Sequence, residues 1–368
     1  MKTKLPFAMV GTSKTVPDIF YLTHFRAPDP VCAVAMPDGE ALLVVSSMEL
    51  GRARREAAPA CRVETAETLG LGLGPGASPD STLGAVLAKE KIRRVLVHPD
   101  CPAGAVRAVE AGGVEVSVAR ESPWAEERQI KTPREIRAIA LSQRAARRAE
   151  KALGDEIKAA EPDGRGRLRL RGALLTSELA RRIVRQELVA ADAIDEDGTI
   201  VAGGVQAADP HEASHGALRA GEAIVADVFP RSLKTGYWGD MTRTHCSGRL
   251  SRDVRALRDA VAEAQKIAIG AIRPGASGAE VHAAVKDFFE RKGFRTGRDA
   301  SGRPYGFIHS TGHGVGLEIH EEPRLSPSGQ LLRPGMTVTV EPGLYYPGIG
   351  GVRIEDTVLV VPAGCEIL

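Results

Sequence analysis

Cysteine is scarce in this sequence and is not arranged for a disulfide or zinc scaffold. The 368 residues contain 5 cysteines, at Cys32, Cys61, Cys101, Cys246 and Cys365, and no two of them form a Cys-x-x-Cys pair. Disulfide-stabilised secreted domains and Cys-type structural zinc sites use closely spaced cysteines, so neither is expected. An odd number of scattered thiols favours a reduced, cytoplasmic protein.

Long apolar runs and an excess of one charge are also missing. No stretch approaches about 18 consecutive apolar residues, so no membrane-spanning helix is expected. The run LPFAMV near the N-terminus is too short for the core of a signal peptide, and polar residues follow it. The formal net charge of +2 argues neither for nor against an anionic partner.

The remaining composition is that of an ordinary globular protein with two domains. Hydrophobic residues make up 43% of the chain and charged residues 26%. Single cores rarely grow beyond about 250–300 residues, so the length favours two domains.

The first third of the chain alternates short apolar runs with helical patterns. The predicted strands span 31–36, 41–46, 93–98 and 114–119. The predicted helices span about 49–58, 81–91 and 102–111. The first two strands flank the turn sequence PDGE and form a predicted hairpin. This alternation predicts an N-terminal α/β domain over residues 1–124.

A second domain is predicted over residues 125–368. Thr132 and Pro133 are typical of an N-cap followed by proline at the first helical position, so a long helix is expected from about 133. Further helices are predicted at about 174–190, 253–272 and 277–293. Strands are predicted near 198–206, 223–229, 236–246, 336–341 and 352–361. Their order indicates two halves of helices and strands.

An arginine-rich stretch, EPDGRGRLRLRG, occupies residues 161–172. We interpret it as a solvated hairpin or mobile loop. An arm for nucleic acid is the alternative, but no aromatic residues are interleaved for base stacking. No nucleic-acid partner is therefore predicted.

Four carboxylates fall in or beside strands whose neighbours are apolar. IVADV (224–228) carries Asp227, and GYWGDMTRT (236–244) carries Asp240. The segment between them is predicted to be a hairpin turn, which would bring the two strands side by side. VTVEPG places Glu341 at the end of a buried strand. GGVRIED places Arg353 and Glu355 on one strand face by the period of two, so that Arg353 is positioned to orient Glu355.

Buried carboxylates repel one another and take up protons unless cations hold them. Two divalent ions would neutralise the charge of the set Asp227, Asp240, Glu341 and Glu355. With one imidazole added, such a site is rich in oxygen with one nitrogen ligand. This donor set suits Mn²⁺, Co²⁺, Fe²⁺ or Zn²⁺.

The segment HSTGHGVGLEIH (309–320) supplies three imidazoles, from His309, His313 and His320. Its three glycines, each unfavourable by about 1 kcal/mol inside a helix, favour a strand or loop. They also allow the backbone to come close to a ligand. His245 and His282 are interpreted as structural histidines.

Taken together, these motifs resemble the pita-bread metallopeptidases, in particular the branch that contains prolidase and aminopeptidase P. ERQIKTPREI resembles the interdomain segment of that family, and GYWGDMTRT, HSTGHGVGLEIHEEP, VEPGLYY and GGVRIED resemble its metal and substrate motifs in the same order. The resemblance covers nearly the whole chain. It implies a creatinase-like N-terminal α/β domain and a C-terminal pita-bread domain, an α+β fold with pseudo-two-fold symmetry.

The resemblance also assigns roles residue by residue. It implies metal ligands at Asp227, Asp240, His313, Glu341 and Glu355. It implies catalytic roles for His211, His309, His320 and Glu341, where Glu341 is the proton acceptor and His215 is the alternative to His211. It implies that Arg324 binds substrate, since this residue is placed to hold a substrate carboxylate. We predict Arg353 as a second substrate-binding residue.

The implied reaction is hydrolysis of Xaa-Pro peptide bonds by a hydroxide that bridges two divalent ions, with Mn, Co or Zn as candidates. Prolidase activity on dipeptides is slightly preferred. Aminopeptidase P activity on longer peptides is the alternative, and a non-catalytic binding protein on the same fold is a remote one. A cytoplasmic homodimer that acts on proline-containing peptides is expected, with no membrane partner.

Overall fold

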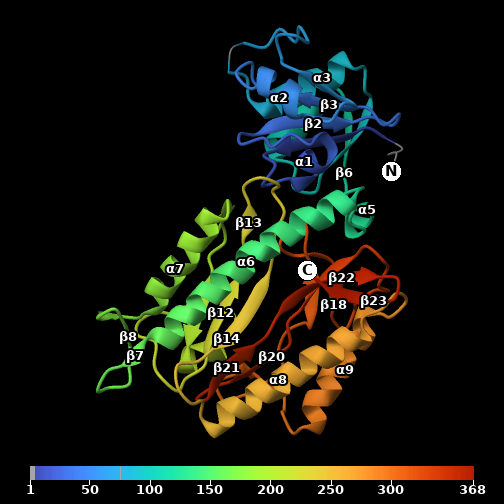
Figure 1. Ribbon diagram of the computed structural model, residues 1–368. Helices are drawn as coiled ribbons and strands as arrows, with labels where there is room; N and C mark the ends of the chain where they lie inside the picture. The colour runs from blue at the N-terminus through green and yellow to red at the C-terminus, as the bar shows by residue number, and fades with distance from the viewer. Residues whose placement is uncertain (1–4, 75) are drawn as a thin grey trace. The chain divides into compact units, whose positions relative to one another are not determined.

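The computed structural model describes residues 5–74 and 76–368. The chain divides into two compact units, one ending at Glu127 and the other beginning at Arg128 (Figure 1). The boundary predicted from the sequence lies between residues 124 and 125. Within the described ranges, no helix has both the length and the apolar composition that crossing a membrane requires.

The first unit is built on a six-stranded sheet with the order β4-β3-β2-β1-β5-β6. Its strands are β1 (Phe7–Gly11), β2 (Val31–Ala35), β3 (Ala41–Val44), β4 (Cys61–Glu64), β5 (Arg94–Val97) and β6 (Glu115–Val118). The helices are α1 (Pro17–Thr23), α2 (Leu50–Glu56), α3 (Pro79–Lys89), α4 (Ala103–Ala111) and α5 (Ala125–Gln129), which crosses the unit boundary. The predicted hairpin is confirmed as the antiparallel pair β2–β3. Strands β1 and β4 were not predicted.

The second unit contains two main sheets, each with its own helices. Strands β11 (Ile200–Gly203), β12 (Ile224–Val228) and β14 (Met241–His245) form one sheet, and α6 (Pro133–Ala159) and α7 (Ser177–Ala190) pack on it. The second sheet has the order β18-β17-β19-β22-β23. Its strands are β17 (Gly312–Gly314), β18 (Glu321–Leu325), β19 (Thr337–Val340), β22 (Asp356–Val361) and β23 (Gly364–Ile367). Helices α8 (Arg252–Ala271) and α9 (Gly278–Arg291) pack on this sheet. The two predicted halves are confirmed.

Short elements complete the second unit. They are β7 (Glu161–Pro162), β8 (Leu168–Leu170), β9 (Ala173–Leu174), β10 (Ala193–Ile194), the 3-10 helix η1 (Gly204–Ala208), β13 (Arg231–Ser232), β15 (Gly297–Arg298), β16 (Pro304–Tyr305), β20 (Gly343–Tyr346) and β21 (Gly350–Arg353). Strands β7, β8 and β9 form a small antiparallel sheet, so the arginine-rich stretch is a hairpin as interpreted.

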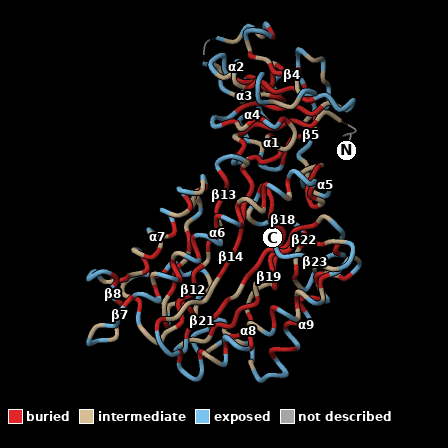
Figure 2. The backbone as a smooth tube through the Cα atoms, in the orientation of Figure 1, coloured by how far each residue is buried: buried red, intermediate tan, exposed pale blue. Residues whose placement is uncertain are grey.

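Helix α6 begins where the sequence predicted. The Thr132 side chain accepts a hydrogen bond from the backbone of Glu135, and the Glu135 carboxylate accepts one from the backbone of Thr132. This capping box satisfies two backbone N–H groups that the first turn would otherwise leave unpaired. In Figure 2 the buried residues follow the sheet strands and the inner faces of the helices that cover them.

Two predictions about the strands that carry acids are wrong. The predicted strand 352–361 is broken at Ile354 and Glu355, because β21 pairs with β20 while β22 pairs with β19 and β23. The connection between Asp227 and Asp240 is more than a turn, since it contains β13, which pairs with β10. Asp240 lies just before β14, and the register partner of Asp227 is Thr242.

Candidate metal centre

The short strand β17 holds His313 between two neighbouring strands. A side chain at Gly312 would place its Cβ 1.9 Å from the carbonyl oxygen of Thr339, and one at Gly314 would lie 2.3 Å from that of Glu322. These two glycines therefore allow β17 to lie close to the backbones of β19 and β18. The sequence had instead suggested that they make room for a ligand. The backbone N–H of His313 donates to the Thr339 hydroxyl at 3.0 Å, which fixes the strand further.

The ring orientation of His313 leaves one nitrogen free to act as a ligand. Its Nδ1 lies 3.1 Å from the carbonyl oxygen of Gly314, which can only accept, so Nδ1 carries the proton. The Nε2 lone pair then faces Oδ2 of Asp240 at 3.5 Å and Oε1 of Glu341 at 3.3 Å. Three acceptors that face one another without a proton need a cation between them.

The backbone of Asp240 is held by a side chain of helix α6. The side-chain amide of Gln143 accepts from the backbone N–H of Asp240 and donates to its carbonyl oxygen, both at 2.9 Å. This close approach depends on Gly239, because a Cβ there would lie 2.7 Å from the backbone of Ser142. The buried Asp240 carboxylate is thereby fixed without using its own oxygens.

Thr242 connects two further acids, Asp227 and Glu355. Its hydroxyl lies 2.7 Å from Oε2 of Glu355 and 3.0 Å from Oδ1 of Asp227, and it accepts from Nε of Arg353 at 3.1 Å. The single hydroxyl proton can serve only one carboxylate at a time. Within the part of the chain that the structure describes, the buried Oε1 of Glu355 has no hydrogen-bond partner, so it remains available to a cation.

Glu341 lies directly after β19, as predicted. Its backbone N–H donates to the carbonyl oxygen of Thr311 at 2.8 Å, and its Oε1 accepts from the hydroxyl of Thr339 at 3.1 Å. Thr339 therefore supports both Glu341 and His313, and it brings the end of β19 against β17.

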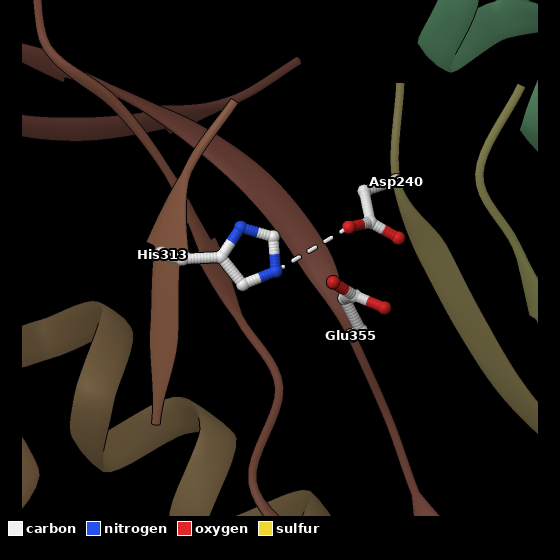
Figure 3. Close-up of side chains that lie close together, drawn as sticks. All are labelled: Asp240, His313 and Glu355. Atoms are coloured by element: carbon white, nitrogen blue, oxygen red, sulfur yellow. Dashed lines mark ion pairs between the residues drawn. The ribbon is translucent and has the colours of Figure 1, made fainter. Parts of the chain in front are cut away.

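The electrostatics of these residues fit a cation site. Burial, reinforced by the neighbouring carboxylates, raises the pKa values of Asp240 and Glu355 well above their usual range. Burial also raises the pKa of Glu341 to about 7. Burial lowers the pKa of His313 to about 3, which keeps its imidazole neutral and able to bind a metal. A divalent ion would remove the repulsion between the acids, and ligand atoms of Asp240, His313 and Glu355 all lie within 4.8 Å of one another (Figure 3).

The guanidinium of Arg353 holds the carboxylate of Asp227 in place. Its Nη2 lies 2.6 Å from Oδ2 of Asp227, and its Nη1 donates to the Tyr345 hydroxyl at 2.7 Å. The Tyr345 hydroxyl in turn lies 3.0 Å from Nε2 of His309, whose Nδ1 donates to the carbonyl oxygen of Ser310 at 2.7 Å. Arg353 therefore bonds Asp227 directly. It is linked to Glu355 through the Thr242 hydroxyl, which contacts both residues. Both ring nitrogens of His309 are already occupied.

The remaining predicted residues lie at the exposed side of this cluster. His320 is exposed, and its ring packs edge-on against that of His313 with centroids 4.4 Å apart. Arg324 is the register partner of His313, its side chain is 40% exposed, and its one ion pair among the described residues is with Glu322, at 3.9 Å. Burial lowers the pKa of His320, and the charges of Arg324 and His211 lower it further. Arg324 and His211 therefore both lie near His320.

His211 and its alternative His215 differ in their surroundings. His211 is exposed, and its charge, after burial and Arg353, contributes to lowering the pKa of His309 to about 3. The backbone of His215 instead exchanges hydrogen bonds with the side chain of Gln206. Of the two histidines, His211 is the one whose charge acts on His309.

The loop that carries His320 is anchored by ion pairs and a tryptophan. Nη2 of Arg128 lies 2.6 Å from Glu318 and 2.8 Å from Glu321, and Lys131 also pairs with Glu321. The indole N–H of Trp238 donates to the carbonyl oxygen of Leu317 at 3.1 Å. His320 is therefore presented from a fixed segment.

The two histidines interpreted as structural are held by protein groups. His245 pairs with the buried Glu150 at 2.7 Å, and Nδ1 of His282 lies 3.0 Å from the hydroxyl of Thr311. Neither belongs to the cluster around His313.

Three supporting residues were missed by the sequence reasoning. Thr242 carried a usable signal, because the period of two that places Asp240 also places Thr242 on the same face. Tyr345 and Gln143 carried none, since each looks like an ordinary strand or helix residue and makes its contacts with distant segments.

Comparisons with known proteins agree with this geometry. The sequence model of metallopeptidase family M24 matches residues 137–362. The chain is 41% identical over 174 residues to an Xaa-Pro dipeptidase of Pyrococcus furiosus, and this alignment spans 46% of each protein, less than half of the relative's length. Among solved structures it resembles prolidase from Pyrococcus furiosus, with a TM-score of 0.79 and 25% identity over 98% of this chain and 95% of that one.

An Xaa-Pro aminopeptidase has a similar fold. The structure of X-Pro aminopeptidase from Thermotoga maritima matches with a TM-score of 0.80 and 23% identity, covering 99% of this chain and 94% of that one. These likenesses over nearly the full length confirm the fold that the sequence resemblance implied.

Proposed function

The chain belongs to metallopeptidase family M24, and from this membership we propose that it hydrolyses Xaa-Pro peptide bonds with a pair of divalent metal ions. The observation that carries the proposal is the buried cluster of Asp240, His313 and Glu355, whose ligand atoms all lie within 4.8 Å of one another. A structural role for this cluster is disfavoured, because without cations its carboxylates repel one another.

We assign the metal ligands to Asp227, Asp240, His313, Glu341 and Glu355. When bound, divalent ions would supply a Lewis acid and lower the pKa of water. The oxygen-rich donor set with one imidazole favours Mn²⁺, Co²⁺ or Zn²⁺ over softer metals. Thr242 and Arg353 orient Asp227 and Glu355, and Gln143 orients Asp240 through its backbone.

The protein side chains divide the remaining chemical work. Glu341 accepts the proton of the attacking water, a role for which a pKa raised by burial to about 7 is well matched. His320 and His211 are exposed and lie near each other, where an imidazole N–H can donate to the oxygen of the scissile carbonyl. His309 is held in place by hydrogen bonds to Tyr345 and Ser310, and its ring forms part of the wall of the site.

We place a free substrate carboxylate at Arg324, which favours a dipeptidase. Arg324 is the register partner of His313, its side chain is partly exposed, and among the described residues its one ion pair is the long contact of 3.9 Å with Glu322. An arginine so placed can bind a carboxylate through two parallel hydrogen bonds. Release of the first residue from longer peptides remains the second candidate, since an aminopeptidase has a similar fold.

Peptide hydrolysis tests the proposal directly. The chelator-treated chain would be given Mn²⁺, Co²⁺ or Zn²⁺ and then Ala-Pro, Ala-Pro-Ala or Ala-Ala. We expect cleavage of Ala-Pro, weak or no cleavage of Ala-Pro-Ala and none of Ala-Ala. Preferential release of alanine from Ala-Pro-Ala would instead assign the aminopeptidase activity. Failure to cleave either proline peptide with metal bound would refute the proposal.

Replacing Arg324 by glutamine separates the two activities. Because the proposed partner of Arg324 is the C-terminal carboxylate, Arg324→Gln should lower kcat/KM for Ala-Pro about 10²-fold, or about 3 kcal/mol, mainly through KM. Cleavage of the amide Ala-Pro-NH₂, which lacks that carboxylate, should be slow in the parent and nearly unchanged by the substitution. Equal losses on both substrates would show that Arg324 does not read the carboxylate.

The homodimer and the cytoplasmic location expected from the sequence stay predictions, as do the domain boundaries at 1–124 and 125–368. Light scattering on the purified chain tests the homodimer, and cell fractionation tests the location. Expression of the two separate segments tests the domain boundaries.

A further inference from the structure

A cavity in the second unit lies apart from the metal cluster and is lined by basic side chains. Its volume is about 550 Å³, and its walls come from α6, β14, the loop 246–250 and the beginning of α8. The basic side chains are Lys158, Arg249, Arg255 and Arg258, and none of the described lining residues is an aspartate or glutamate. In Figure 1 the end of α6 and the start of α8 flank the same end of β14.

Most of this positive charge is not neutralised by the protein. Arg258 pairs with Asp259 at 3.0 Å, but both side chains are largely exposed, so that pair is weak. Arg255 donates one hydrogen bond to the carbonyl oxygen of Leu250 at 3.3 Å, which leaves its charge unpaired. Among the described residues, no carboxylate forms an ion pair with Lys158, Arg249 or Arg255.

The arginine-rich hairpin provides an instructive contrast. It leads out of α6, a helix that also lines the cavity, and the carbonyl oxygen of Arg165 accepts a hydrogen bond from Arg219. Its charges, however, are mostly used internally, because Arg167 pairs with Asp163 at 2.7 Å and Arg171 pairs with Glu156. The unpaired charge therefore gathers in the cavity rather than on the hairpin that the sequence singles out.

The floor of the cavity contains a histidine that is held by a neighbouring acid. His245 is held by the buried Glu150, and its Nδ1 has no hydrogen-bond partner in the part of the chain that the structure describes. The ring occupies space that exists only because residue 154 is glycine, where a Cβ would lie 2.8 Å from it. A polar ring edge thus lines the cavity beside the basic groups.

The cavity and the metal cluster occupy opposite ends of β14. Asp240 precedes the strand and His245 ends it, so at about 3.3 Å per residue the two ends are about 16 Å apart. None of the five proposed metal ligands is among the described residues that line the cavity, so the cavity is distinct from the metal centre.

From these observations we propose that the cavity is a binding site for a small molecule that carries a phosphate group. Arginine forks match the oxygens of phosphate, and several unpaired cations exceed what one carboxylate would require. The volume is larger than a free phosphate needs and lies in the range of small-molecule sites, so an organic group attached to the phosphate is accommodated.

Calorimetric titration of the metal-loaded full chain tests this site. The probes are inorganic phosphate, glucose 6-phosphate and adenosine monophosphate at about 0.15 M salt, where non-specific attraction between exposed charges is largely screened. The double variant Lys158→Gln/Arg249→Gln removes two exposed charges from the cavity. The matched control Arg169→Gln/Arg171→Gln removes two charges from the hairpin.

We expect at least one probe to bind the parent and the hairpin control equally, and to bind the cavity variant at least tenfold more weakly. Tighter binding of an ester than of inorganic phosphate would identify a phosphorylated metabolite, and the reverse would identify free phosphate. Any binding at the metal ions is common to all three proteins and cannot produce the difference. Equal affinities in all three proteins, equal losses in both variants or no binding by any probe would overturn the proposal. This test needs no peptidase activity.

Discussion

Replacing Glu355 by glutamine should lower kcat for Ala-Pro at least about 10³-fold, or about 4 kcal/mol, while making the chelator-treated protein more stable. The loss follows because a neutral amide is a poor ligand where a buried carboxylate is required. The gain follows because the buried Oε1 of Glu355 has no hydrogen-bond partner among the described residues, and because the neighbouring carboxylates repel the charged form. We expect the gain to be about 1–3 kcal/mol in urea unfolding, the usual scale for an unpartnered buried polar group.

The stability difference should grow as the pH rises. The folded state raises the pKa of Glu355, so the folded protein binds this proton more tightly than the unfolded chain does. Stability from that group is complete below its unfolded pKa of about 4.3 and is lost as the pH rises toward the folded value. Glu355→Gln removes this loss, so its advantage should be small at pH 5 and larger at pH 8. An advantage that shrinks with rising pH would contradict the charge repulsion inferred for this cluster.

Replacing Arg353 by methionine should destabilise the chelator-treated protein by about 3–5 kcal/mol. The side chains of Arg353 and Asp227 are 5% and 14% exposed, and their atoms approach to 2.6 Å, so the substitution leaves a buried carboxylate without its cation. The Tyr345 hydroxyl and Thr242 lose a donor at the same time. Because Asp227 is a proposed metal ligand, kcat should also fall about 10–100-fold, as for other residues that orient a ligand.

Arg324→Met is the matched control for this prediction. It removes the same side chain from a position that is 40% exposed and has its nearest carboxylate at 3.9 Å, so unfolding should change by no more than about 0.5 kcal/mol. Saturating Mn²⁺ should narrow the gap between the Arg353 variant and the parent, because metal ions would then compensate the charge of Asp227. Equal stability of the two variants in chelator would show that the Arg353–Asp227 pair contributes little.

Local sequence patterns predicted the segments that carry the site, because the chemistry lies at the ends of strongly apolar strands. Glu341 follows the strand TVTV, and Asp227 interrupts the buried run IVADV, so each acid was visible against its neighbours. The start of α6 was predictable from Thr132 and Glu135, which act within one turn.

Features that depend on distant partners were not predictable in this way. The period of two continues through Ile354 and Glu355, and the break appears only because β21 and β22 join different sheets. Strands β10 and β13 have two residues each and carry no periodic signal. Gln143 looks like a helix-surface residue, yet it holds Asp240 at a separation of 97 residues.

Titration of Mn²⁺ into the chelator-treated chain, followed by the rate of Ala-Pro hydrolysis, tests the central claim most directly. The proposed ligand set predicts a rate that rises until about two equivalents per chain and then levels off, and Asp240→Asn should show no such rise. A rate that is complete at one equivalent would contradict the two-ion centre. Hydrolysis that persists in chelator, or that Asp240→Asn leaves intact, would contradict the metal mechanism altogether.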